Sequence, residues 1–234
     1  MRQGRTERLL RSRFGLLVSL PRNDPTLARA ALEAGADGLK VHIGLSHFAS
    51  GLDTGSLAEE QDGIRQIVEL GAPVGIVPGV GEQMAGREEM RRLAEMGIDF
   101  FDLYATDMPA WMLRMDDCAM SVMVAFSATC RPWALVEEVG GASRPELIEA
   151  SIMPHEAYGE ALTAADVSEY AAIARRATQP VIAPTQKAIQ PEEVGVLIDC
   201  GLAGVLIGAI VTGTEPTSLA RATESFRAAI DAQS

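Results

Sequence analysis

The amino-acid sequence predicts a (β/α)8 barrel, the TIM-barrel architecture of the α/β class, as one domain over residues 1–234. A unit made of a helix, a glycine and an apolar strand recurs, and it reads most clearly at 27–44, 64–79, 88–105 and 192–209. In each copy, apolar residues return every three or four positions before the glycine, as in a helix packed on one side. Eight apolar strands can be counted, and the loop after the third has Met84 where a dinucleotide-binding motif needs its last glycine. A closed barrel is therefore favoured over an open, doubly wound sheet.

The elements follow in order from the N-terminus. Residues 1–13 are rich in arginine and predict a short leading helix, because Glu7 interrupts the positive charge and the apolar stretch that follows is short for a targeting signal. Residues 14–231 form the predicted barrel. The longest segments after strands are 44–60 and 153–165, where binding and catalysis are expected to concentrate. The strands are expected at 15–20, 38–43, 74–77, 99–104, 120–126, 147–152, 181–183 and 204–208.

Composition argues against several classes of protein. Hydrophobic residues make up 47% of the chain, enough for one large core, and no apolar run is long enough to span a membrane. The net charge of −12 repels nucleic acid and anionic lipid. Cys118, Cys130 and Cys200 are widely separated, which argues against a disulfide framework or a zinc knuckle. We expect a cytoplasmic protein that binds neither nucleic acid nor membrane, and whose self-association into a homo-oligomer is left open by the sequence.

Only two lysines, Lys40 and Lys187, occur among the twenty basic residues, and both fall where predicted strands run out. Wherever a solvated cation suffices, this sequence uses arginine. The two lysines are therefore candidates for a role that needs a compact ammonium group with an adjustable pKa.

Strand alternation predicts which side chains enter the barrel. On strand 38–43 the odd-numbered apolar residues suit the helix side, which turns Lys40 and His42 inward. The same rule turns Asp102 inward on strand 99–104 and Glu149 inward on strand 147–152. Because each layer inside such a barrel comes from alternate strands, Lys40, Asp102 and Glu149 are expected to meet and to form an acid/base pair with coupled titrations.

Other uses of these residues stay open. Inward charges can plug a barrel as a salt-bridge network without a catalytic role. His42 fits a satisfied core position as well as a catalytic one. A metal site built from His42, His155, Asp102 and Glu149 is a third possibility, but no ligand spacing supports it, and we expect neither a metal nor an organic cofactor.

The last quarter of the chain predicts a phosphate-binding site. Backbone N–H groups after the seventh and eighth strands of such barrels, with a short helix N-terminus, commonly hold phosphate. Residues that come from strand ends, or that lie just beyond them, are expected to contact the rest of the substrate: Ser19, Tyr104, Ser151 and His155. The residues expected to hold the phosphate are Thr185, Gln186, Lys187, Gly208, Ala209, Thr212 and Gly213.

The stretch IAPTQKAIQPEEVGVLIDCGLAGVLIGAIVTG at 182–213, with FRAAI at 226–230, resembles the last quarter of ribulose-phosphate-binding barrels. Within that superfamily it is most similar to N-acylglucosamine-6-phosphate 2-epimerases, and GLLVSL at 15–20 followed by AGADG at 34–38 is also similar. The resemblance implies the barrel fold and phosphate binding. The lysine that those epimerases carry on the third strand is replaced by Val77-Pro78, and their acid after the seventh strand by Pro184-Thr185.

These observations lead to three hypotheses. The first is an isomerase or epimerase that abstracts a proton next to a carbonyl of a small phosphorylated metabolite, with Lys40 and Glu149 exchanging the proton and His42 or Asp102 orienting the substrate. The second is a lyase in which Lys40 or Lys187 forms a Schiff base. The third is a sugar-phosphate-binding protein without catalysis.

Overall fold

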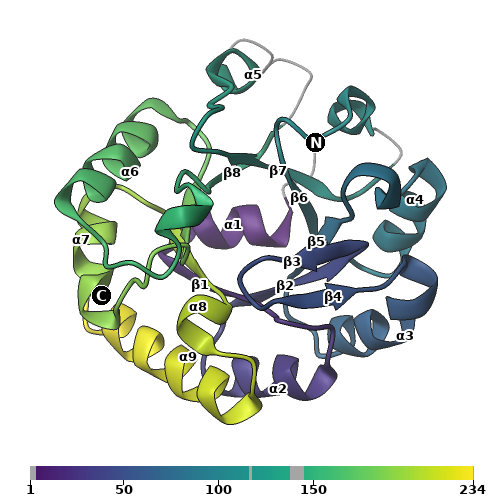
Figure 1. Cartoon of the computed structure of the whole chain (residues 1–234), viewed down its shortest axis with the longest axis horizontal. Helices are drawn as coiled ribbons and strands as arrows, with labels where there is room; N and C mark the ends of the chain where they lie inside the picture. The colour runs from purple at the N-terminus through teal and green to yellow at the C-terminus, as the bar shows by residue number, and fades with distance from the viewer. Residues whose placement is uncertain (1–3, 116–117, 138–144, 234) are drawn as a thin grey trace.

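Eight parallel strands close into a barrel in the computed structural model, which describes residues 4–115, 118–137 and 145–233 (Figure 1). The strands pair in the closed order β1-β10-β9-β8-β7-β6-β5-β2. The TIM-barrel prediction is confirmed, and the ends of each expected strand lie within two residues of the ends of the observed strand. The strands are β1 (Gly15–Ser19), β2 (Gly38–Ile43), β5 (Val74–Pro78), β6 (Phe100–Tyr104), β7 (Ser121–Phe126), β8 (Leu147–Ala150), β9 (Val181–Pro184) and β10 (Gly204–Ile207).

Helices alternate with the strands and surround the barrel (Figure 1). The N-terminus of α2 shows the local reason: Pro25 takes the first position, and the side chain of Asp24 accepts a hydrogen bond from the backbone N–H of Thr26. Gly35 and Gly97 follow helices with φ of 99° and 98°, which explains the recurrent glycine. The longer helices are α2 (Pro25–Glu33), α3 (Leu57–Val68), α4 (Arg87–Glu95), α6 (Ala164–Arg176), α7 (Val194–Asp199) and α9 (Pro216–Asp231); α5 (Trp133–Glu137), α8 (Ala209–Thr212) and the 3-10 turns η1 (Gly81–Gln83), η2 (Ala110–Arg114), η3 (His155–Ala157) and η4 (Pro191–Glu193) are short.

The leading helix, α1 (Arg5–Ser12), closes the N-terminal end of the barrel. Its Leu10 packs against an apolar layer inside the strands, made of Leu17, Phe100, Met123, Leu147, Ile182 and Leu206. A Cβ added to Gly15 or Gly204 would lie 2.6 or 3.0 Å from a methyl group of Leu10, so these glycines make room for the helix. Asp99, just before β6, accepts hydrogen bonds from the backbone N–H groups of Arg5 and Thr6 at 2.9 and 2.7 Å. The barrel is therefore sealed at this end, and a ligand has to enter from the other.

The long segment 44–60 folds into a hairpin that the sequence did not predict. Strands β3 (Leu45–His47) and β4 (Leu52–Thr54) pair antiparallel, and the Thr54 hydroxyl closes the hairpin by donating to the carbonyl of Leu45 at 3.1 Å. The hairpin lies over the end of the barrel that faces the viewer in Figure 1. Among the described residues, no helix has both the length and the apolar character to cross a membrane.

Candidate functional site

A pocket of about 360 Å³ opens at the carboxyl ends of the barrel strands. Its floor consists of polar side chains from β1, β2, β6 and β8, and its mouth of mostly apolar and aromatic side chains on the loops. The lining includes Ser19, Lys40, His42, Leu45, His47, Phe48, Val80, Asp102, Tyr104, Asp107, Glu149, Ser151, His155, Tyr158, Thr185, Gln186 and Gly208.

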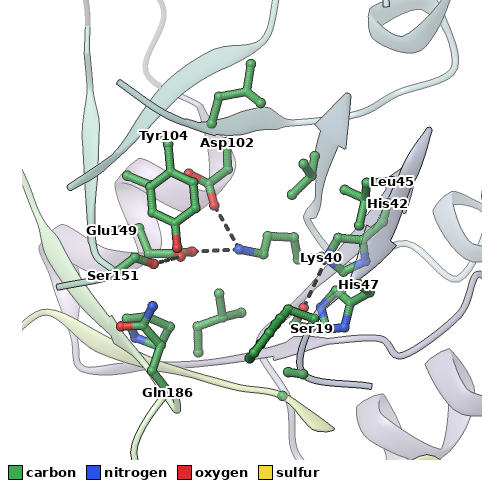
Figure 2. A pocket seen from close by; sticks show the side chains of 18 of the residues that line it. Ser19, Lys40, His42, Leu45, His47, Asp102, Tyr104, Glu149, Ser151 and Gln186 are labelled. Atoms are coloured by element: carbon green, nitrogen blue, oxygen red, sulfur yellow. Dashed lines mark hydrogen bonds and ion pairs between the residues drawn. The ribbon is translucent and has the colours of Figure 1, made fainter. Parts of the chain in front are cut away.

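The floor is organised around Lys40, as Figure 2 shows. Its ammonium Nζ donates to Asp102 Oδ2 at 2.8 Å and to Glu149 Oε2 at 2.6 Å, and only 6% of the residue is exposed. The three residues come from β2, β6 and β8, and their strand neighbours Val41, Leu103 and Ile148 pack outward under the helices. The alternation predicted from the sequence thus brings the three charged groups together. Their catalytic role remains a prediction.

The charges of this triad follow from burial and contact. Burial disfavours the ammonium of Lys40, but the two carboxylates outweigh it and hold its pKa above the ordinary value. Burial alone would also raise the pKa of Glu149, but the Lys40 charge and hydrogen bonds, one from the Ser151 hydroxyl, hold it below its usual range. Burial, reinforced by the Glu149 charge, raises the pKa of Asp102 well above normal. At neutral pH the triad therefore holds an ammonium, a carboxylate and a neutral carboxylic acid.

Two histidines flank the triad, and both are neutral. Burial lowers the pKa of His42 well below its usual value, and burial together with the Lys40 charge lowers that of His47 to about 4. Nε2 of His42 lies 3.3 Å from Ser19 Oγ, while its buried Nδ1 has no hydrogen-bond partner among the described residues. Oδ1 of Asp102 is also buried and has no hydrogen-bond partner among the described residues. Two buried polar atoms of the floor are thus left for a ligand or a water molecule.

Tyr104 and Tyr158 bring two phenol groups into the pocket. Burial, with further contributions from neighbouring groups, raises the pKa of both, so both hydroxyls stay protonated. The Tyr158 hydroxyl accepts a hydrogen bond from Gln186 Nε2 at 2.6 Å, and Gln186 Oε1 accepts from the backbone N–H of Met153 at 3.0 Å. Gln186 therefore fixes the segment after β8 against the end of β9.

The expected phosphate-binding residues do not all reach the pocket. Thr185, Gln186 and Gly208 line it, but the N–H of Gly208 already donates to Thr185 Oγ1 at 2.9 Å. Lys187 does not line the pocket; its Nζ pairs instead with Glu160 Oε2 at 2.8 Å and Asp166 Oδ2 at 3.9 Å. Binding of a phosphate by this lysine would require those ion pairs to break. Ala209, Thr212 and Gly213 also lie outside the lining.

Arg22 is a cation that the sequence did not single out. It follows β1, and its guanidinium donates to the carbonyl of Thr214 at 3.0 Å, so it lies beside the loop after β10. The backbone N–H groups of Ala209 and Ile210, at the start of α8, have no acceptor within the described part of the chain. The same described residues contain no cluster of three or more histidine, cysteine or carboxylate groups suited to a metal.

The histidines on the loops, His47 and His155, contact other rings. His47 lies edge-on to His42, with ring centroids 4.5 Å apart, and its Nδ1 accepts from the backbone N–H of Ser50 at 3.2 Å. His155 stacks on Phe48, which belongs to the turn between β3 and β4. Phe48 and Tyr158 were missed in the sequence, where their only signal is an aromatic residue in a long loop.

Comparison with solved structures shows the same fold. Thiamine phosphate pyrophosphorylase from Pyrococcus furiosus matches with a TM-score of 0.63 and 17% identity over 95% of this chain and 98% of its own. For 3-hexulose-6-phosphate synthase the TM-score is 0.67 and the sequence identity 15%, over 93% of this chain and 100% of the synthase. For phosphoribosyl anthranilate isomerase from Thermus thermophilus the TM-score is 0.62 and the sequence identity 16%, over 94% of this chain and 99% of the isomerase. No family model and no curated protein matches the sequence. At these identities the likeness establishes the barrel fold alone.

Proposed function

We propose that the protein is an enzyme that moves a proton next to a carbonyl group of a small phosphorylated metabolite, as an isomerase or epimerase does. The observation that carries this proposal is the ammonium of Lys40 held between Asp102 and Glu149 on the pocket floor. The solved structures that share the fold include a synthase and an isomerase whose names contain a phosphorylated sugar. The resemblance of the C-terminal quarter to N-acylglucosamine-6-phosphate 2-epimerases points the same way.

The charges of the triad suggest a division of roles. Glu149 is ionised and buried, so it can accept a proton from carbon in a site that excludes bulk water. The Lys40 ammonium beside it can stabilise the negative charge that develops on the carbonyl oxygen, and it can return a proton. Asp102 is neutral, and its Oδ1, which lacks a partner, can bond a substrate oxygen. His42 can orient the substrate through Nδ1.

The phosphate is proposed to lie at the side of the mouth formed by β9, β10 and β1. The N–H groups of Ala209 and Ile210 are available there, Thr185 and Gly208 line the pocket, and Arg22 supplies a positive charge beside the same loop. Ser19 and Ser151 would contact the substrate between this end and the triad.

A lyase that works through a Schiff base on Lys40 is the weaker candidate. The attacking amine must be neutral, whereas two carboxylates hold Lys40 in its charged form. Trapping with borohydride in the presence of a bound carbonyl compound tests this point, because a covalent adduct on Lys40 would favour the lyase.

The proposal is tested by proton NMR in deuterium oxide with a panel of sugar phosphates, each paired with its unphosphorylated parent. We expect a phosphorylated compound to lose a proton next to its carbonyl, and the rate to fall at least 100-fold in Lys40→Met, on the order of one general acid or base. Binding, followed by the thermal shift, should persist in this variant. Lys187→Met is the matched control, because Lys187 is ion-paired outside the pocket. An unchanged exchange rate in Lys40→Met, or binding that does not depend on the phosphate, would overturn the proposal.

A further inference from the structure

The loops after β2 and β8 meet above the pocket. In the closed strand order, β2 and β8 lie on opposite sides of the barrel. Phe48, on the hairpin after β2, nevertheless stacks on His155 in η3 after β8, with ring centroids 4.1 Å apart and planes 12° from parallel. Tyr158 stands edge-on to both rings, with centroids 5.2 Å away and planes at 88°. We call Phe48, His155 and Tyr158 the ring cluster; all three line the pocket, and they join the loop after β2 to the loop after β8.

The ring cluster leaves apolar surface open. Phe48 is 60% exposed and Val80 40% exposed, and among the described residues the only other large apolar side chain this exposed is Val196 on α7. Phe48 and Val80 line the same pocket, whereas Val196 does not. Two of the three most exposed large apolar side chains are thus gathered at the entrance of one cavity, where a ligand would cover them.

The rings are held in place before any ligand arrives. Tyr158 is fixed by its hydrogen bond with Gln186. The turn that carries Phe48 is closed by backbone bonds from Ser50 and Gly51 to the carbonyl of His47, at 3.2 and 2.8 Å. Rings ordered in this way lose little conformational freedom when a flat partner packs on them.

The ring cluster differs from the floor of the pocket in its charge. Apart from the three histidines, the acidic and basic side chains of the lining are Lys40, Asp102 and Glu149 on the floor and Asp107 near the start of the loop after β6. Arginine does not occur in the lining, and the residues around Phe48 on the hairpin are uncharged. Apart from Lys40 on the floor, no lysine or arginine lines this pocket, and the ring cluster offers an apolar ring faces and edges suited to stacking.

We propose that the ring cluster is a subsite for a flat, uncharged ring carried by the substrate. This rests on the proposed function for the carbonyl and the phosphate, and it names the third part of the molecule. Phe48 determines the preference for the ring, while Tyr158 and His155 orient it. The substrate is then a phosphorylated carbonyl compound that also carries an aromatic or comparably flat ring.

The test compares two probes that differ in the ring, phenylpyruvate and 2-oxobutanoate, by ligand-observed NMR titration. We expect phenylpyruvate to bind about 10-fold more tightly, because stacking alone accounts for roughly 2- to 10-fold and burial of the exposed Phe48 adds to it. The ratio of the dissociation constant of 2-oxobutanoate to that of phenylpyruvate should fall close to one in Phe48→Ala. It should take an intermediate value in Phe48→Leu, which keeps apolar bulk without a ring. Val196→Ala is the matched control, since it trims an exposed apolar side chain that lies outside the pocket.

Two results would overturn the subsite: a ratio near one in the unmodified protein, including weak binding of both probes alike, or a ratio that survives in Phe48→Ala. The same titration on Lys40→Met should show the ring preference of the unmodified protein, because this substitution leaves the ring cluster in place. A ring preference in an unmodified protein that exchanges no proton of any phosphorylated compound would support the subsite and refute the reaction. Proton exchange without a ring preference does the reverse.

Discussion

Removal of the Lys40 ammonium should turn the triad into a site that takes up a proton. In Lys40→Met, Asp102 and Glu149 remain buried side by side without a cation. Breaking a buried ion pair by removing one partner costs about 3–5 kcal/mol. We therefore expect the free energy of unfolding at pH 7 to fall by roughly that amount.

The sign of the pH dependence follows from Glu149. In the unmodified protein its pKa is lowered, so it stays ionised between pH 7 and pH 5, and its stabilisation is lost only as the pH falls through that lowered value. Without Lys40, burial and the neighbouring carboxyl raise this pKa above that of the unfolded chain. At Glu149 the folded variant then binds a proton that the unfolded variant lacks. This group should therefore add stability as the pH falls, by at most about 1.4 kcal/mol per pH unit, or about 2.7 kcal/mol between pH 7 and pH 5.

Urea unfolding of both proteins at pH 7 and pH 5 measures this difference. The deficit is the free energy of unfolding of the unmodified protein minus that of the variant at the same pH. Taking this difference removes the contributions of His42, His47 and other groups that titrate in both proteins. The double variant Lys40→Met/Glu149→Gln is the control, because it has no ionised carboxylate to neutralise, and its deficit should be independent of pH. A Lys40→Met deficit of the same size at both pH values would refute the charges assigned to the triad.

Three further changes test other parts of the structure. Asp99→Ala removes the acceptor for the backbone N–H groups at the start of α1, so urea unfolding should show a loss of about 1–3 kcal/mol, with ligand binding at the far end of the barrel unchanged. Because the pKa of His47 is lowered to about 4, the folded protein loses stability as the pH falls below 6.5, and His47→Gln should remove about 2 kcal/mol of the loss between pH 7 and pH 5; an unaltered pH profile would contradict this. Gly75→Ala places a methyl group 2.0 Å from the Phe100 ring, so it should cost about 2–3 kcal/mol, and Phe100→Leu should recover part of that cost in the double variant.

The polar floor was predictable because strand periodicity is local. The even-numbered positions of strand 38–43 and the alternation around Asp102 and Glu149 decide which side chains enter the barrel, and barrel geometry then brings the three strands to one layer. The charge state of each carboxyl was not predictable, because it depends on which oxygen meets Lys40 and how deeply each group is buried.

The roof of the pocket could not be read from the sequence for a different reason. The stacking of Phe48 on His155 joins two loops that are far apart in the chain, and neither loop has a periodic pattern. The hairpin strands β3 and β4 are three residues each, too short for alternation to reveal. Lys187 is similar: its partner Glu160 lies in another loop, so the orientation of the lysine away from the pocket depends on a contact that the sequence does not encode locally.

The pairing of β1 with β10 has a consequence for the order of folding. Gly15 is the partner of Gly204, and α2, which follows β1, packs on α9 near the C-terminus. During synthesis β1 therefore emerges long before β10, and the edge of β1 that pairs with β10 stays free until this last strand leaves the ribosome. Such long-range closure slows folding and exposes intermediates to aggregation. Chaperone dependence and expression yield should accordingly be most sensitive to substitutions along the β1–β10 seam.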